Sequence, residues 1–514
     1  MTDGPRRAAL REAAAAAIAL ALAALLAGHL ALSDRSWLIY ADGDSMLPAL
    51  LQASLRVGQR QDWALSAPLF IPEVAAYRAV AAVHLPVAST LTIAGIVNWS
   101  ALYAALRFVA GASRRAAAPF WALGGFTTIV SLALLERSSD RNSLESVSLL
   151  STGTYYSATI VGMVLIIGIV VRLVPAVAVR RGIALLAALF ALTAFLTLTN
   201  PLVVPWCVAP LAFVGLGLAA RRLLPWSATG IGLAVLAIAV AAGLAARLPF
   251  ASMLVESTDA IYRPALIGES AGYYAGLVAA LVGSWQGALE ALLVLALVAN
   301  AAVGSVVALR RGRTPVALVA TIAWLAPVLT VGGAIVAGTV AARYLQPVFF
   351  LPVVALVVAG VPLPGPARGW RPVVAAASII PLITAIALLP PGARRPGALT
   401  ETLGSIQCVA DWVTSSRRIG AGTFWTIRAP KAYLPDPRQL VQTDASLNPY
   451  VWLVDRADYD GLRSVSFLVS SADAAPPEPP RGEAALPTPD VIRCGRYTIT
   501  DYRDAVLRLG APRS

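Results

Sequence analysis

The sequence predicts a polytopic α-helical membrane protein that carries a small mixed α/β domain at its C-terminal end. Residues of the set AVILMFWYC make up 58% of the 514 residues, charged residues make up only 13%, and the mean hydropathy is +0.73. Soluble domains average about 45–50% apolar and about 25% charged residues. A soluble fold could not enclose this much apolar surface, so we expect most of the chain to lie in a membrane.

Apolar stretches long enough to cross a membrane recur along the chain. A helix needs about 20 apolar residues to cross the hydrocarbon layer. The expected spans, about eleven, lie near 13–33, 85–110, 117–135, 154–179, 182–200, 202–220, 226–246, 286–308, 315–341, 346–363 and 371–391. Three arginines precede the first, as in a signal peptide, but its apolar stretch of roughly 20 residues favours a retained helix. The short stretch 276–284 either extends the eighth span or forms a re-entrant piece.

The basic residues predict how the spans are oriented. The net charge is +13, but the arginines fall in short clusters between the spans rather than in one patch, so we expect no nucleic-acid partner. Such clusters mark the cytoplasmic side of a membrane protein. With the N-terminus in the cytoplasm, every strong cluster falls on that side. The clusters are Arg6-Arg7, Arg114-Arg115, Arg180-Arg181, Arg221-Arg222, Arg310-Arg311-Arg313, and Arg368 with Arg371.

Counting crossings from a cytoplasmic N-terminus places three loops and the tail on the outer side. The loops are 34–84, 136–153 and 247–285. We therefore divide the chain into a membrane domain, 1–391, and an extracytoplasmic domain, 392–514.

The tail has the composition of a soluble domain. Aromatic and β-branched stretches at 423–427, 450–454 and 465–469 predict short strands. Cys408 and Cys494 lie near its two ends, and in an oxidising exterior they would form a stabilising disulfide. The alternative is a pair of unpaired buried thiols.

Acidic residues in the first outer loop are the first candidates for chemistry. Asp42-Gly43-Asp44 follows the first span closely, and a carboxylate there could deprotonate a hydroxyl or hold a divalent cation beside a phosphate. The alternative is an ordinary turn. Further on, Phe70-Ile71-Pro72-Glu73 places a proline and an acid where a helix would begin, which predicts an interfacial helix over 73–84.

Two arginines oppose the charge pattern because they lie on the arginine-poor side. Arg263 shares the third outer loop with Glu269, and Arg343 ends a long apolar span. A guanidinium matches a phosphate in a bidentate manner. The alternative is that these side chains only reach toward lipid headgroups.

Several classes of site are excluded by what the sequence lacks. The chain has two histidines, His29 and His84, which argues against a His-based metal site or a His-dependent triad. It has no P-loop, no Gly-rich dinucleotide fingerprint and no CxxC pair. It therefore has no ATP motor of its own.

The chain resembles the GT-C fold glycosyltransferases, which use polyprenyl-phosphate sugars. The likeness lies in the N-terminal helix, the acidic first outer loop, the number of spans, a large later outer loop and the outer C-terminal domain. The Asp-Gly-Asp and Phe-x-Pro-Glu segments are most similar to those of uncharacterised bacterial membrane proteins of this type. Arg343-Tyr344-Leu345-Gln346-Pro347 matches the Arg-Tyr-x-x-Pro segment that lies near the lipid phosphate in the family.

The resemblance implies an inverting glycosyltransferase of the bacterial cytoplasmic membrane. Asp44, or else Asp42, would be the base that activates a glycan, lipid or protein acceptor. Because Ser45 stands where the family often has a second acid, the need for a metal stays open. Residues implied to bind the donor phosphate or substrate are Arg343, Tyr344, Arg263, Glu269 and Glu73.

Two other classes of function remain. A transporter or flippase of a lipid-linked sugar would use the same arginines without a base. A non-catalytic scaffold of the cell envelope would need far fewer spans than the sequence predicts.

Overall fold

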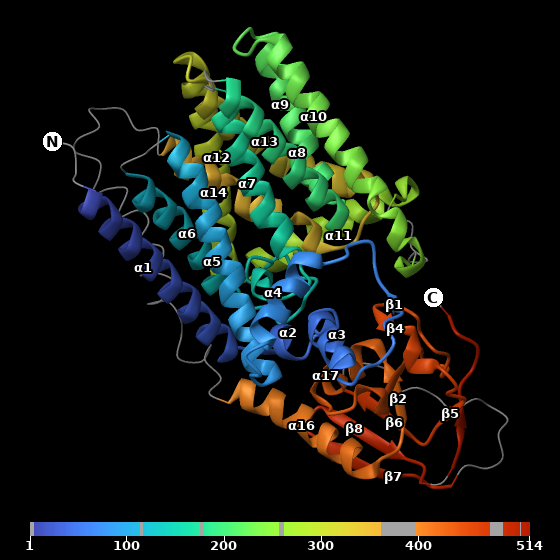
Figure 1. The fold of residues 1–514 in the computed structure, drawn as a ribbon. Coiled ribbons are helices and arrows are strands. Elements are labelled where there is room, and N and C mark those ends of the chain that lie inside the picture. The colour runs from blue at the N-terminus through green and yellow to red at the C-terminus, as the bar shows by residue number, and fades with distance from the viewer. Residues whose placement is uncertain are drawn as a thin grey trace.

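A computed structural model describes residues 5–113, 117–174, 179–255, 262–360, 397–472, 487–503 and 505–513. Its described part is a bundle of long helices with a mixed α/β domain at one end (Figure 1). Nine of the described helices are long and apolar enough to cross a membrane, so the chain is a multi-pass membrane protein. The predicted span 371–391 lies outside the described residues.

The bundle consists of eleven described helices. Their bounds are α1 Pro5–Ala31, α5 Val87–Ser113, α6 Ala118–Leu135, α7 Ser157–Leu173, α8 Val179–Thr199, α9 Ala209–Ala220, α10 Trp226–Ala245, α11 Ile267–Val282, α12 Trp285–Arg310, α13 Thr314–Val336 and α14 Pro347–Ala359. Helix α14 is central, in contact with α5, α6, α7, α12 and α13. Helices α1 and α10 lie on opposite flanks (Figure 1).

One expectation about the bundle is wrong. The segment 247–285 is not a loop throughout, because it contains α11, which with its preceding turn is a candidate span by length and composition. Since the connections after α9 and α12 meet at one end of the bundle, α11 between α10 and α12 starts and ends at the other end, which leaves the re-entrant alternative. Glycines and Glu269 lower the hydropathy of the first half of α11, so the sequence does not predict a helix there. Helix α11 does not extend the eighth span either: Gly283 and Ser284 separate it from α12, and Ser284 Oγ caps α12 by accepting from the Gly287 amide at 3.0 Å.

Arginine clusters and long loops lie at opposite ends of the bundle. Arg221-Arg222 follows α9 and Arg310-Arg311 ends α12, and these connections meet where Thr314 Oγ1 donates to the Leu223 carbonyl at 3.4 Å. At the other end, Arg247 after α10 donates to carbonyl oxygens of Leu198, in α8, and of the first loop. The bundle therefore has one arginine-rich end and one loop-rich end.

The first loop is folded rather than extended. It contains α2 (Ser36–Tyr40), α3 (Leu47–Arg56), the short strand β1 (Trp63–Ala64) and α4 (Ile71–Ala81). Helix α4 packs on α3, α5 and α7, which makes the loop part of the bundle's core.

The C-terminal unit is mixed α/β, as the composition predicts. A five-stranded sheet has the order β3-β2-β6-β8-β7, with β2 parallel to β3 and β6 and with β8 antiparallel to its neighbours. The elements are α16 Ala398–Ser416, β2 Gly420–Thr423, α17 Phe424–Tyr433, β3 Leu440–Thr443, β4 Val454–Asp455, β5 Ser464–Val465, β6 Phe467–Ser471, β7 Asp490–Cys494, β8 Tyr497–Asp501 and β9 Leu507–Arg508. Cys408 and Cys494 form a disulfide that joins α16 to β7.

The strand expected over 423–427 is wrong. Strand β2 ends at Thr423, and the following residues form α17 instead. The cause is topology: β2 and β3 are parallel neighbours, and such strands need a crossover connection, usually a helix.

The C-terminal unit is joined to the first loop by backbone pairing. Strand β1 pairs antiparallel with β4, with Trp63 opposite Asp455 and Ala64 opposite Val454. Leu65 continues the connection to Leu254, beyond α10. Three segments that are distant in sequence therefore meet at the loop-rich end.

Candidate functional site

Both candidate catalytic aspartates occupy one turn between α2 and α3, which we call the aspartate turn (Asp42-Gly43-Asp44). Asp42 is completely buried, whereas the side chain of Asp44 is 16% exposed. Of the two, only Asp44 is within reach of a ligand.

Asp42 is surrounded by hydrogen-bond donors. Arg141 Nη1 lies 2.6 Å from Asp42 Oδ1, Tyr155 Oη donates to Asp42 Oδ2 at 2.9 Å, and the Ser45 amide donates to the same oxygen at 3.3 Å. Burial raises the pKa of Asp42, and Asp44 adds to the rise, while Arg141 opposes it. With these partners Asp42 fixes the shape of the turn.

Asp44 faces Arg343. Asp44 Oδ2 lies 4.0 Å from Arg343 Nη1, and both side chains are partly exposed. Thr154 Oγ1 donates to the Asp44 carbonyl oxygen at 2.8 Å, which ties the turn to the segment before α7. A carboxylate and a guanidinium group thus lie side by side at the loop-rich end of the bundle.

Arg343 is positioned by the central helix. It lies in η6 (Ala342–Leu345), directly before α14, and Gln346 Nε2 anchors this turn by donating to the Tyr155 carbonyl at 3.1 Å. The rings of Tyr155 and Tyr344 each have their centres 5.9 Å from the guanidinium carbon of Arg343. The Arg-Tyr-x-x-Pro segment therefore does contribute to the surroundings of the aspartate turn.

Two aromatic residues beside this site have an uncommon backbone conformation. Phe70 and Tyr156 directly precede α4 and α7 with φ angles of 51° and 66°. This left-handed region costs a bulky residue on the order of 1–3 kcal/mol and is concentrated at functional sites. Their rings stack with centres 6.2 Å apart, and Tyr156 also lies 6.4 Å from Tyr344. The strained pair thus borders Arg343 through Tyr344.

Glu73 is buried where α4 and α7 meet. It lies in the first turn of α4, and its Oε1 accepts from the Ala158 amide in the first turn of α7 at 3.0 Å. Two helix N-termini favour a negative charge there, but burial outweighs them and raises the pKa of Glu73 to about 7. Glu73 joins two helices next to Tyr156.

The other two predicted site residues lie beyond α13, near α11. The amide of Arg263 donates to the Ala337 carbonyl at 2.8 Å, which places Arg263 against the C-terminal end of α13. Glu269 is exposed in the first turn of α11. The described contacts bring together Asp42, Asp44, Arg343 and Tyr344, whereas Arg263 and Glu269 lie where α11 begins and α13 ends.

Two arginines that were not among the predicted site residues contact the aspartate turn in the structure. Arg141 lies on the arginine-poor side, so the signal that selected Arg263 and Arg343 would also have found it. Arg428 is buried in α17, and its Nε donates to the Gly43 carbonyl at 2.7 Å. Nothing local in the sequence relates it to a turn 385 residues earlier.

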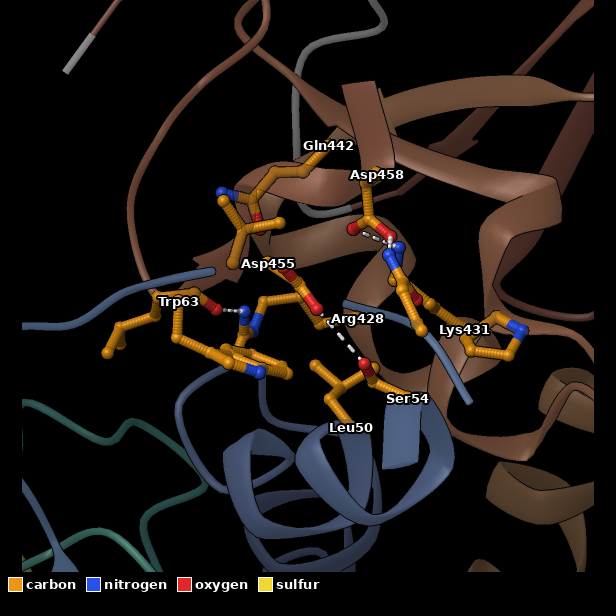
Figure 2. A pocket seen from close by; sticks show the side chains of 12 residues that line it. Leu50, Ser54, Trp63, Arg428, Lys431, Gln442, Asp455 and Asp458 are labelled. Atoms are coloured by element: carbon orange, nitrogen blue, oxygen red, sulfur yellow. Dashed lines mark hydrogen bonds and ion pairs between the residues drawn. The ribbon is translucent and has the colours of Figure 1, made fainter. Parts of the chain in front are cut away.

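Arg428 belongs to a polar interface between α3 and the C-terminal unit (Figure 2). Ser54 Oγ donates to Asp455 Oδ2 at 3.0 Å, and the Lys431 ammonium pairs with Asp458 at 2.5 Å. Burial lowers the pKa of Arg428 to about 10. Its Nη1 donates to the Leu453 carbonyl, so the guanidinium links the C-terminal unit to the aspartate turn.

No cluster of three or more His, Cys, Asp and Glu side chains that could hold a metal ion occurs among the described residues. Comparison with known proteins adds no identification: no protein-family model matches the chain, and no curated protein matches its sequence.

Proposed function

We propose that the protein is a membrane glycosyltransferase of the GT-C type that moves a sugar from a polyprenyl-phosphate donor to an extracytoplasmic acceptor. The observation that supports this most directly is the partly exposed pair of Asp44 and Arg343, with 4.0 Å between carboxylate and guanidinium. Transfer from a phosphorylated lipid needs a base for the acceptor and a cation for the phosphate. Both are available at one place.

The donor phosphate binds Arg343 and competes with Asp44 for the guanidinium, which frees the carboxylate. The acceptor hydroxyl oxygen then attacks the anomeric carbon while its proton passes to Asp44. The carbon–oxygen bond to the phosphate breaks, and its electron pair leaves with the polyprenyl phosphate, whose growing charge Arg343 stabilises. Tyr344 borders the phosphate, and the apolar helices accommodate the lipid.

The proposed orientation follows the charge pattern. The arginine-rich end faces the cytoplasm and the loop-rich end faces the outside of a bacterial cytoplasmic membrane. The site and the C-terminal unit are then extracytoplasmic, where a flipped lipid-linked sugar is available without a nucleotide.

The test uses the full chain in lipid nanodiscs with undecaprenyl-phosphate-linked hexoses and a delipidated cell-envelope glycan fraction. Release of undecaprenyl phosphate is measured. Asp44→Asn should lower turnover by about 10²–10⁴-fold, the range for loss of a general base. Arg343→Ala should also lower turnover strongly, and Arg343→Lys should be intermediate because lysine retains the charge but not the planar fork.

Matched controls are Asp62→Asn in the same loop and Arg78→Ala, exposed on α4. Both should retain turnover. Wild-type turnover in Asp44→Asn would exclude Asp44 as the base. If, after reconstitution in sealed liposomes, the donor crosses the bilayer uncleaved and Asp44→Asn transports it equally well, the protein is a flippase instead.

A further inference from the structure

A cavity of about 660 Å³ lies beside the aspartate turn. Its walls come from the first loop, the segment after α6 and the C-terminal unit. Residues lining it include Trp37, Arg141, Glu401, Trp425, Arg496 and Tyr497. Its volume falls within the range of small-molecule sites, about 300–1,000 Å³.

Cations and aromatic rings alternate along one wall of this cavity. The guanidinium carbon of Arg496 lies 5.7 Å from the ring centre of Trp37, and that of Arg141 lies 5.7 Å from Trp37 and 3.4 Å from Trp425. Trp425 remains 42% exposed. The stacking holds two indole rings in fixed positions at the cavity.

Polar groups complete the lining. The lining also includes three acidic residues, Asp34, Asp140 and Glu401, and two serines, Ser405 and Ser471. With three acidic residues against two arginines, the lining disfavours a polyanionic ligand, and this polar surface disfavours a lipid chain. A pyranose suits both kinds of wall, because its C–H face packs on an indole ring while its hydroxyl groups bond to carboxylates and guanidinium groups.

The cavity shares two residues with the surroundings of the aspartate turn. Arg141 pairs with Asp42 at 2.6 Å. Trp425 packs so closely on Gly43 that a Cβ there would lie 3.1 Å from its ring. A ligand in the cavity is therefore next to the turn that carries Asp44.

From these observations we propose that the cavity binds the acceptor, and that the acceptor is a saccharide. That the bound saccharide is the acceptor rests on the proposed function, whereas the presence of a saccharide site does not.

Binding is measured by saturation-transfer-difference NMR on the full chain in nanodiscs. The probes are neutral and uronic-acid-containing di- and trisaccharides at millimolar concentration. At least one should bind the wild type. Trp425→Ala should weaken its binding by about tenfold, since loss of one stacked ring corresponds to about one decade in Kd. The matched control is Trp285→Ala, because Trp285 is similarly exposed, at 49%, but does not line the cavity.

Glu401→Gln tests another lining residue without altering Trp425 or the arginines, and it should weaken binding several-fold. The proposal is overturned if no saccharide of the panel binds, or if both Trp425→Ala and Glu401→Gln bind like the wild type. If the wild type shows no transfer but saccharide binding persists, including in Asp44→Asn, the cavity is a saccharide site and the transferase proposal is wrong. If the protein does transfer sugar, and the KM for the acceptor is unchanged in both Glu401→Gln and Trp425→Ala, the transferase proposal stands and the cavity is not the acceptor site.

Discussion

Glu73 makes the stability of the protein depend on pH. Its pKa rises from 4.5 to about 7 on folding, so between these values the native state retains a proton that the unfolded state has released. Stability therefore falls as the pH rises through that window and stays lower above it, by up to about 3 kcal/mol.

Glu73→Gln should remove this dependence, because the amide oxygen can still accept from the Ala158 backbone without carrying a charge. The variant should unfold at a higher temperature than the wild type above pH 7 and at a similar temperature near pH 4.5. Thermal unfolding across this pH range checks it. Asp411→Asn, on the exposed face of α16, is the control. A variant with the wild-type slope would show that Glu73 is charged in the native state throughout.

At the scale of single residues, the sequence could propose the aspartates but could not rank them by burial. Asp42 is buried because Arg141 and Tyr155 close over it, and these residues are 99 and 113 positions away. Such long-range partners leave no local pattern. Arg343 was predictable because its charge opposes the rule for its side of the membrane.

Among the elements, the aspartate turn and α17 are in close contact. A Cβ on Gly43 would lie 3.0 Å from Phe424 Cε1, 3.1 Å from Trp425 Cε3 and 3.3 Å from the Phe424 carbonyl oxygen. A Cβ at this position would require Phe424, Trp425 or the turn to move by a few tenths of an ångström.

Gly43→Ala should force α17 away from the turn and destabilise the protein by about 1–3 kcal/mol, as overpacking does. The Arg428–Gly43 hydrogen bond should lengthen at the same time. Gly404→Ala is the control, because nothing lies within 4 Å of a Cβ there and alanine favours the helix. Chemical denaturation measures the stability of both variants. Equal stability of Gly43→Ala and wild type would mean that the contact is not tight in solution.

Most helices were predictable because hydrophobicity is a local property. Helix α11 was missed because glycines dilute its pattern. The aromatic and β-branched residues of 423–427 favour a strand, whereas the parallel topology that makes most of this region a helix depends on β3, further along the chain.

For the whole molecule, the separation of arginine clusters from loops predicts which positions are accessible from outside the cell. Ser252, after α10, and Ser227, near the arginine-rich start of α10, are both exposed. A cysteine introduced as Ser252→Cys should react with a membrane-impermeant maleimide in intact spheroplasts, whereas Ser227→Cys should react only after permeabilisation.

The native cysteines should contribute little background, since two form a disulfide and Cys207 is buried. Wild-type protein measures that background. The opposite labelling pattern would reverse the orientation and place the site in the cytoplasm.

The hydrogen bond from Arg428 to Gly43 also has a consequence for biosynthesis. Its two residues are separated by 385 positions, so at about 5–20 residues per second the ribosome makes the second roughly 20–80 seconds after the first. During that interval the helices can already insert, while the aspartate turn still lacks the guanidinium that holds its carbonyl. A nascent or truncated chain therefore carries an unfinished site, and the turn is secured only when the last quarter of the chain has been translated.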